Sequence, residues 1–268
     1  MLRLRVNGYD MAYIELGQGD RLVCIHGSLG DFRTWSPVLG PLSRRCRVIA
    51  PSLRHFFPEH WNGVGQDYTI AQHVDDVIAF LDALGGKVDL LGHSRGGHIA
   101  FRVAQRRPDL LRRLILAEPG GDLDASLAPA VSMPSLKSRM AAAVDKIAAG
   151  DIDGGLEAAI DAIMSPGAWQ RFPPTAQQEF RDNARTLLGQ SNEQRPPYAR
   201  ADAEQIRVPT LFIGGADTPG TLPIVLRALA SHVPGARTAM IPNATHFMFY
   251  DDPVRFSAIV LEFLASAS

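Results

Sequence analysis

The chain has 268 residues, of which 46% are hydrophobic and 21% are charged, and its formal net charge is -1. These values are typical of one large globular domain, or of one domain with an inserted segment, and they exclude a disordered chain. The near-zero charge provides no field that would attract nucleic acid or an anionic membrane, and no apolar stretch approaches the roughly 18 to 20 residues of a membrane span. We therefore expect a small-molecule substrate, no nucleic acid and no membrane as partners, while the oligomeric state stays open.

Short apolar runs and helical patterns alternate along the chain, which is typical of an α/β fold with a mostly parallel sheet covered by helices on both faces. Residues 1–6 alternate apolar and basic side chains, which indicates a first strand and lacks the apolar core of a signal peptide, so we expect a cytoplasmic protein. The pattern predicts about eight strands. They are expected at 1–6, 11–16, 22–25, 48–50, 88–91, 114–117, 210–213 and 237–240.

Two of the predicted helices have clear end signals. Thr69 and Gln72 can form a capping box at the start of a helix for which Gly85 supplies the end. Asp252 can cap the last helix, and Pro253 suits its first turn. Both helices carry a regular apolar stripe, so each should cover one face of the sheet.

The strand pattern stops between residues 119 and 205, where one helical pattern follows another. A capping box of Thr175 and Gln178 would begin the third of these helices, with Leu188 on its buried stripe. We therefore predict a helical cap inserted after the sixth strand. The predicted division is a core of residues 1–118 and 206–268 with 119–205 as the cap.

Ser94 is the candidate nucleophile, in the run Gly92-His93-Ser94-Arg95-Gly96. A Gly-x-Ser-x-Gly pattern alone is a weak signal, but here it directly follows the 88–91 strand and precedes a helical face. Such a strand-to-helix turn holds a serine strained and exposed. The start of the helix also offers backbone N–H groups to a developing oxyanion.

A serine hydroxyl needs a base that removes its proton and a third group that orients the base. His246 and Asp217 are the best candidates, since each follows a predicted strand and should lie beyond its carboxyl end. The chain order Ser, Asp, His is that of nucleophile-elbow hydrolases. Glu118, at the end of the 114–117 strand, is the alternative acid.

With these residues the sequence resembles the α/β-hydrolase superfamily over nearly its whole length, in particular capped serine hydrolases of the esterase, carbon–carbon hydrolase and haloperoxidase group. The run His26-Gly27-Ser28 after the third strand completes the pattern. The resemblance implies a catalytic triad of Ser94, His246 and Asp217. It also implies an oxyanion hole formed by the backbone N–H groups of Ser28 and Arg95.

Five further residues are candidates for substrate binding: Leu29, Arg54, His55, His93 and Phe247. Arg54 and His55 lie where many family members carry an Asp and a Gly-rich loop. An arginine fork suits a carboxylate, although a solvated loop is the alternative. His93 could shape the pocket or pack, and His26 is expected to hydrogen-bond the backbone.

The expected activity is that of a carboxylesterase-like serine hydrolase, which transfers an acyl group from an ester to Ser94 and then to water. We expect no metal and no cofactor, since the sequence has no ligand cluster and no phosphate-binding fingerprint. The same residues would also serve carbon–carbon bond, lactone or thioester hydrolysis or perhydrolysis. A receptor or scaffold with negligible turnover is the alternative from another class, and an acidic nucleophile would need a different residue at position 94.

Overall fold

The computed structural model describes residues 1–127 and 136–266. All eight predicted strands are confirmed, and they form one sheet in the order β1-β2-β4-β3-β5-β6-β7-β8. The first two strands are antiparallel to their neighbours, and the others pair in parallel. The strands are β1 (Leu2–Val6), β2 (Tyr9–Leu16), β3 (Arg21–Ile25), β4 (Arg47–Pro51), β5 (Val88–His93), β6 (Leu111–Ala117), β7 (Thr210–Gly215) and β8 (Arg237–Ile241).

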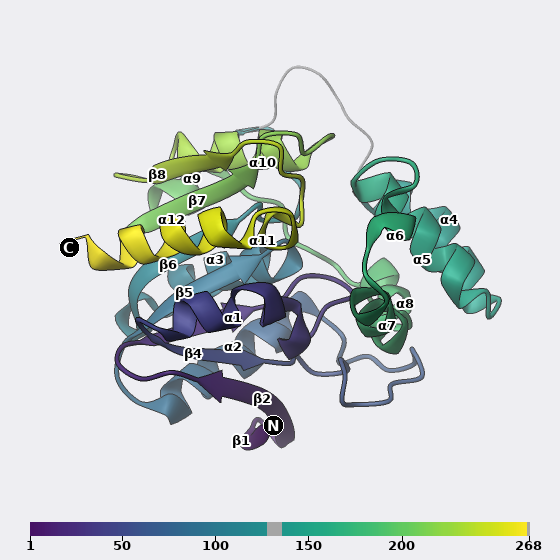
Figure 1. Ribbon diagram of the computed structural model, residues 1–268, viewed down its shortest axis with the longest axis horizontal. Coiled ribbons are helices and arrows are strands. Elements are labelled where there is room, and N and C mark those ends of the chain that lie inside the picture. The colour runs from purple at the N-terminus through teal and green to yellow at the C-terminus, as the bar shows by residue number, and fades with distance from the viewer. Residues whose placement is uncertain (128–135, 267–268) are drawn as a thin grey trace.

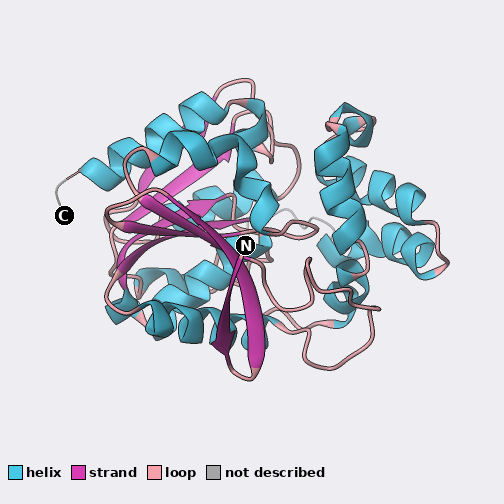
Figure 2. Ribbon diagram, turned by 60° about the horizontal axis from the view of Figure 1, so that its bottom comes forward, coloured by secondary structure: helices cyan, strands magenta, loops and turns pink. Residues whose placement is uncertain are grey.

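Helices cover both faces of this sheet, as predicted (Figure 2). Successive side chains of a strand point to opposite faces, so Leu22 and Cys24 of β3 join one core cluster while Val23 and Ile25 join the other. The first cluster includes side chains of α1 (Ser36–Ser43), α11 (Met248–Asp251) and α12 (Pro253–Ala265). The second includes those of α2 (Ile70–Leu84), α3 (Arg95–Arg106), α9 (Arg200–Glu204) and α10 (Leu222–Ala230). Short 3-10 turns lie at Phe32–Trp35 and Pro108–Leu110.

The predicted helix ends are largely confirmed. The Thr69 side chain accepts from the Gln72 N–H and Gly85 has a φ of 71°, but the Gln72 side chain donates to Asp76 instead of completing a capping box. The Asp252 side chain accepts from the Arg255 N–H at the start of α12. These bonds satisfy backbone donors that a helix start otherwise leaves unpaired.

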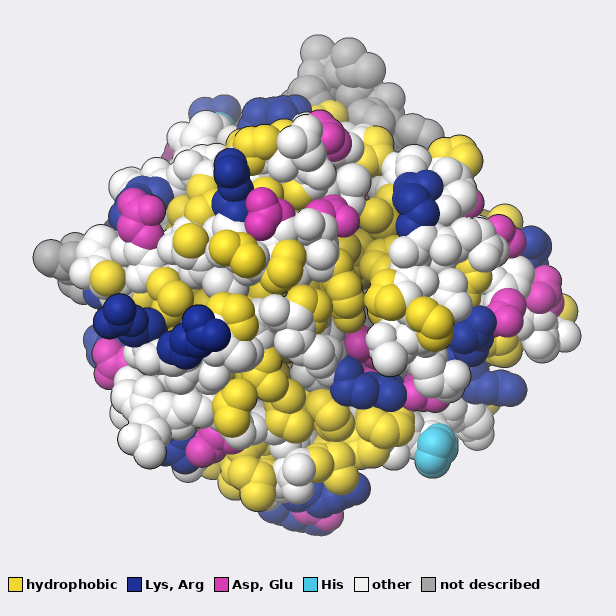
Figure 3. All heavy atoms as spheres, viewed as in Figure 1, with side chains coloured by type: hydrophobic (Ala, Val, Ile, Leu, Met, Phe, Trp, Pro, Cys, Tyr) yellow, Lys and Arg dark blue, Asp and Glu magenta, His cyan; other side chains and the backbone are white. Residues whose placement is uncertain are grey.

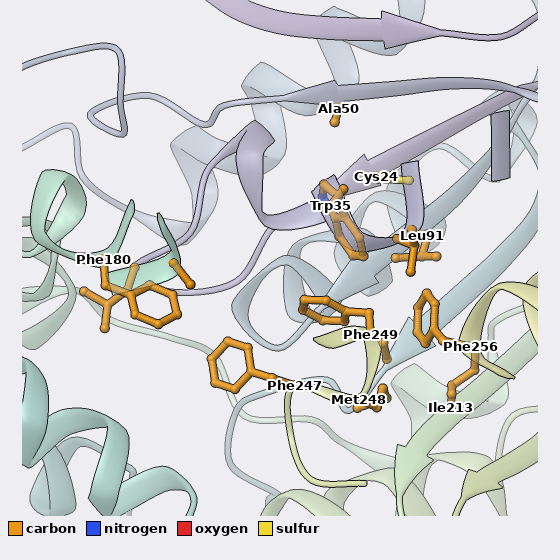
Figure 4. Packing of buried hydrophobic residues seen from close by; sticks show 14 of the residues in the cluster. Cys24, Trp35, Ala50, Leu91, Phe180, Ile213, Phe247, Met248, Phe249 and Phe256 are labelled. Atoms are coloured by element: carbon orange, nitrogen blue, oxygen red, sulfur yellow. The ribbon is translucent and has the colours of Figure 1, made fainter. Parts of the chain in front are cut away.

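Several aromatic side chains of the first core cluster pack together (Figure 4). The ring of Phe249 lies between Trp35 and Phe256, with ring centroids 5.2 Å and 5.8 Å apart. Phe249 belongs to α11, three residues after His246. This packing therefore anchors the loop that carries a candidate catalytic residue.

Besides α9, the described residues between β6 and β7 form five helices, which lie beside the core in Figure 1. We call α4 to α8 the helical segment. On the face drawn in Figure 3, hydrophobic side chains gather along the boundary between this segment and the core. The five helices are α4 (Leu136–Ala148), α5 (Ile152–Ile163), α6 (Ala168–Arg171), α7 (Pro174–Asn183) and α8 (Thr186–Asn192).

The third predicted helix of this segment differs from the sequence interpretation. It begins at Pro174, without a side-chain cap, so the predicted box of Thr175 and Gln178 is wrong. Its apolar stripe continues, but the helix ends at Asn183 and helical structure resumes as α8. No helix of the described residues is long and apolar enough to cross a membrane.

Candidate active site

Ser94 occupies the sharp turn between β5 and α3, with a φ of 52° and a ψ of -116°. A positive φ is rare for a residue with a side chain, so surrounding contacts must hold this strained turn. The Ser94 N–H donates to Ala117 O at 3.0 Å, and Ser94 O accepts from the Gly120 N–H at 2.8 Å. A Cβ atom at Gly96 would lie 2.3 Å from Ile25 O at the end of β3 and from His26 O in the following loop, which explains the glycine there.

The buried ring of His246 faces Glu118. His246 Nδ1 and Glu118 Oε2 are 2.7 Å apart, and the two side chains are 2% and 0% exposed. The other carboxylate oxygen of Glu118 accepts from the Gly215 N–H at 2.9 Å. An imidazole that donates from Nδ1 keeps the lone pair of Nε2 free to accept a proton. This contact therefore leaves His246 Nε2 available as an acceptor, and the carboxylate partner of His246 is the acid that follows β6.

The prediction that Asp217 orients His246 is wrong for this structure. Asp217 is exposed to solvent in the turn after β7. Its backbone N–H donates to Ala244 O at 2.9 Å, so Asp217 supports the loop of His246 through the main chain. Because β6 and β7 are parallel neighbours, acids follow both strands at the same edge of the sheet, and only the fold decides which one reaches the imidazole.

The loop after β3 carries the first predicted oxyanion residue. His26 behaves as predicted: its Nδ1 lies 2.8 Å from Gly27 O, and its Nε2 accepts from the Leu53 N–H at 3.0 Å. Burial lowers the pKa of His26 to about 4, so the ring is neutral and keeps both bonds. The next side chain, Ser28, donates from Oγ to Gln190 Oε1 of α8 at 2.7 Å.

Arg95, the second predicted oxyanion residue, starts α3 and buries its whole guanidinium group. Burial and the Arg95 charge hold the pKa of His73 well below its ordinary value, so His73 Nδ1 accepts from Arg95 Nη1 at 2.9 Å. Arg95 Nη2 donates to the carboxylate of Glu193, whose side chain is 2% exposed. Sequence reasoning did not single out Gln190, His73 or Glu193, since each partner lies far away in the chain.

The polar groups of Arg54 and His55 bind carboxylate side chains of the fold. The Arg54 fork binds Asp76, with Nε 2.8 Å from Oδ2 and Nη2 3.0 Å from Oδ1. His55 Nδ1 lies 2.9 Å from Glu59 Oε1, and His55 Nε2 lies 2.9 Å from Asp67 Oδ1. Burial lowers the pKa of His55, but these hydrogen bonds outweigh burial and raise the pKa above its ordinary value. Their candidate role in substrate binding is therefore not supported, because their partners already occupy them.

His93 and Phe247 line the immediate surroundings of His246. His93 Nε2 lies 3.0 Å from His246 O, and the two imidazole rings have centroids 4.5 Å apart. Burial and the charge of His246 hold the pKa of His93 well below its ordinary value, so its ring is a neutral donor to that carbonyl. Phe247 packs against Phe172 of the helical segment at 5.1 Å between ring centroids. Leu29, with a φ of 65°, is buried in the first core cluster.

A cavity of about 470 Å³ lies between α4, α8 and the loop after β6. Its lining joins apolar side chains of Met140, Val144 and Leu187 to polar ones of Gln190 and Glu193. Gly121 of the same lining directly follows Gly120, which binds Ser94 O. This volume and mixed lining suit a small to medium organic ligand.

A larger cavity of about 710 Å³ lies on the outer side of the 189–196 segment. The start of α2 and side chains of α3 line it, and it shares Asn192 and Glu193 with the smaller cavity. Among the described residues, neither lining includes Ser94 or His246, and only the smaller cavity reaches the loop after β6 that binds Ser94 O. Among the residues that the structure describes, no three His, Cys, Asp or Glu side chains are grouped to hold a metal ion.

A buried polar cluster joins α7 to the loop after β3. Glu179 Oε1 accepts hydrogen bonds from the Thr34 hydroxyl and, at 3.3 Å, from the Asp31 N–H. Asn183 Nδ2 donates to Asp31 Oδ2 at 2.7 Å, and Arg33 pairs with the same carboxylate. Burial and then the charge of Asp31 raise the pKa of Glu179 from 4.5 to about 8, so this acid is protonated at neutral pH.

We expect Glu179→Gln to remove part of the pH dependence of folding. The folded chain keeps the Glu179 proton up to about pH 8, whereas the unfolded chain releases it near pH 4.5, so this group makes stability fall as pH rises between these values. The urea midpoint of the mutant should therefore rise relative to that of the wild type as pH increases from about 5 to about 8. Glu157→Gln, on an exposed side chain of α5, is the control. Identical pH slopes for Glu179→Gln and wild type would contradict the assignment.

Comparison with known proteins gives matches over most of the chain. The model described as the alpha/beta hydrolase family matches residues 22–259. The 2-hydroxymuconate semialdehyde hydrolase of Pseudomonas putida is 28% identical over 282 residues, which cover 97% of this chain and 92% of that protein. The pimeloyl-[acyl-carrier protein] methyl ester esterase of Nitrosomonas europaea is 25% identical over 254 residues, which cover 90% of this chain and 94% of the esterase.

Solved structures share the same architecture. The enol-lactonase from Burkholderia xenovorans LB400 superposes with a TM-score of 0.81 at 22% identity, over 98% of this chain and 100% of the lactonase. At this identity the similarity shows the fold alone. The proteins just described are named for different substrates, so the substrate of this chain must be argued from the site.

Proposed function

The chain belongs to the alpha/beta hydrolase family, and from this membership we propose that it is a serine hydrolase that cleaves a small to medium carbonyl substrate through an acyl-enzyme on Ser94. The observation that carries the proposal is the buried 2.7 Å hydrogen bond between His246 Nδ1 and Glu118 Oε2, with the His246 ring packed against His93, which directly precedes Ser94. The proposed triad is Ser94, His246 and Glu118.

In the first half of the reaction, Ser94 Oγ attacks the carbonyl carbon while His246 Nε2 takes its proton. Glu118 holds the ring and stabilises the imidazolium that forms. The backbone N–H groups of Ser28 and Arg95 bind the oxyanion of the tetrahedral intermediate, an interaction that becomes stronger as negative charge develops. Collapse of the intermediate expels the leaving group, which receives its proton from His246.

In the second half, His246 accepts a proton from water as the water attacks the acyl carbon. A second tetrahedral intermediate forms in the same oxyanion hole and collapses to the free acid and Ser94. The bound oxygen of Ser94 recovers its proton from His246. The sequence of steps consumes one water for each bond cleaved.

We also propose that the helical segment acts as a cap and that the 470 Å³ cavity beneath it holds the substrate. The apolar side chains of α4 and Leu187 favour an apolar part of the substrate, and the polar groups of α8 and Arg195 favour a polar part. An ester with both kinds of group is the substrate class that this lining supports best. Activity on a carbon–carbon bond next to a carbonyl, or on a lactone, is the second candidate, since the same triad would serve these reactions and one relative is named as a 2-hydroxymuconate semialdehyde hydrolase.

A substrate panel tests this proposal. Short-chain and medium-chain p-nitrophenyl esters, lactones and β-diketones are incubated with wild type and with Ser94→Ala. We expect turnover of at least the activated esters by the wild type, with an initial burst of nitrophenol where deacylation is slow. Absence of Ser94-dependent turnover across the whole panel would favour a binding protein over an enzyme.

A further inference from the structure

One end of a single helix binds the side chains of both oxyanion residues. Ser28 Oγ donates to Gln190 Oε1 at 2.7 Å, and the buried guanidinium of Arg95 binds the Glu193 carboxylate. Gln190 lies in the last turn of α8 and Glu193 directly follows the helix, so the two are three positions apart and share one side of it. We propose that Gln190 and Glu193 are positioning residues that hold the two oxyanion donors in register.

The Arg95 side chain is held so firmly that its position depends on that of Glu193 at the end of α8. The guanidinium is fixed from three sides, by Glu193, by His73 Nδ1 at 2.9 Å and by the Tyr68 ring, whose centroid lies 4.9 Å from Arg95 Cζ. Arg195 Nη2 donates to the second oxygen of Glu193 at 2.9 Å, which fixes the carboxylate in turn. A buried ion pair with further hydrogen bonds tolerates little displacement of either partner.

The two oxyanion donors come from separate elements. Ser28 lies in the loop after β3, and Arg95 is the first residue of α3. An oxyanion hole requires both N–H groups to reach one oxygen atom, so their separation must be fixed to a fraction of an ångström. A helix end that binds both side chains sets this separation from outside the sheet.

Gln190 and Glu193 also line the cavity that we assign to the substrate. A substrate that packs against this turn of α8 acts on the same side chains that hold Ser28 and Arg95. Occupancy of the cavity and alignment of the oxyanion hole are therefore coupled, and a substrate that fills the cavity gains in kcat as well as in affinity. This inference rests on the proposed function, because it presumes that these N–H groups bind an oxyanion.

The first test is a double-mutant cycle on the Ser28 contact. Gln190→Ala and Ser28→Ala both remove the hydrogen bond and leave the Ser28 N–H in place, and each should lower kcat for a p-nitrophenyl ester by about 10- to 100-fold. The double mutant should lose no more than the more affected single mutant. Ser28→Thr, which keeps a hydroxyl donor, should recover most of the loss. Losses that multiply in the double mutant would overturn the proposal.

The second test concerns the Arg95 contact and needs variants that fold. Glu193→Gln leaves a buried cation with less compensation, so Arg95→Met with Glu193→Leu removes both charges together. Because Arg195 also pairs with Glu193 and His73 Nδ1 accepts from Arg95, the melting temperature of this pair is measured first, and the folded variant should lose about 10- to 100-fold in kcat. Asp153→Asn, which breaks the exposed Arg181 pair elsewhere in the helical segment, is the matched control and should retain wild-type kcat. A folded double variant with wild-type kcat would overturn the proposal.

Hydrogen exchange provides a readout that does not depend on turnover. Peptides that cover residues 26–32 and 93–99 should exchange faster in Gln190→Ala and in the Arg95→Met, Glu193→Leu variant than in wild type and in Asp153→Asn. Unchanged exchange in both peptides would overturn the positioning role whatever happens to activity. If Ser94→Ala retained wild-type turnover, the proposed function would fail instead, and the exchange result would still decide the coupling.

Discussion

Replacement of Ser94 by alanine is expected to lower kcat for any accepted ester by about 10⁴- to 10⁶-fold, because the acyl-enzyme cannot form. The residual rate should stem from the oxyanion hole and substrate binding, which remain intact. Turnover of a p-nitrophenyl ester, measured with enzyme freed of contaminating esterases, checks this expectation.

The control for Ser94→Ala is a measurement of its thermal stability. The turn has a φ of 52°, which alanine adopts with the same strain as serine, so the melting temperature should stay close to that of the wild type. Ser94→Gly should be as inactive as Ser94→Ala and somewhat more stable, since glycine relieves the strain. An alanine variant that retained more than about a tenth of wild-type kcat would contradict the nucleophile assignment.

Replacement of Glu118, whose carboxylate binds His246, is expected to have the second large effect on activity. Glu118→Gln keeps the size of the side chain but removes the negative charge that stabilises the imidazolium, and it disfavours the tautomer with Nδ1 protonated. We expect kcat to fall by about 10³- to 10⁴-fold, with KM changed far less. Steady-state kinetics at several pH values would measure both parameters.

Asp217→Asn is the matched comparison, since it makes the equivalent change at the acid that the chain order favours. Asp217 is exposed and supports the His246 loop through its backbone N–H, which asparagine retains. Its kcat should stay within about twofold of wild type, as for most surface substitutions. The reverse result, with a large loss in Asp217→Asn and none in Glu118→Gln, would restore the acid predicted from sequence.

The sheet and the nucleophile turn could be predicted because their signals are local. Each strand is a short apolar run, and the turn at Ser94 combines a strand, small residues and a helix within a few positions. The same holds for Asp252, whose capping role depends only on its neighbour Arg255. Local patterns therefore sufficed for the architecture that positions the site.

The remaining parts of the site depend on contacts between residues far apart in the chain. Glu118 and His246 are 128 positions apart, and Ser28 and Gln190 are 162 apart. In the sequence, Gln190 and Glu193 look like ordinary polar residues at the end of an amphipathic helix. For Arg54 and His55 the sequence suggested a substrate-binding role that the structure does not support. Nearby carboxylates already bind both side chains: those of Asp76, Glu59 and Asp67.

Covalent labelling tests directly whether Ser94 is the activated nucleophile. Wild-type protein is treated with a fluorophosphonate, and the adduct is measured by intact mass and located by peptide mapping. We expect one adduct per chain, on Ser94, with labelling slowed strongly in Glu118→Gln and at the wild-type rate in Asp217→Asn. Failure of the wild type to form an adduct, or an adduct on another residue, would contradict the assignment of Ser94 as the nucleophile activated by His246 and Glu118.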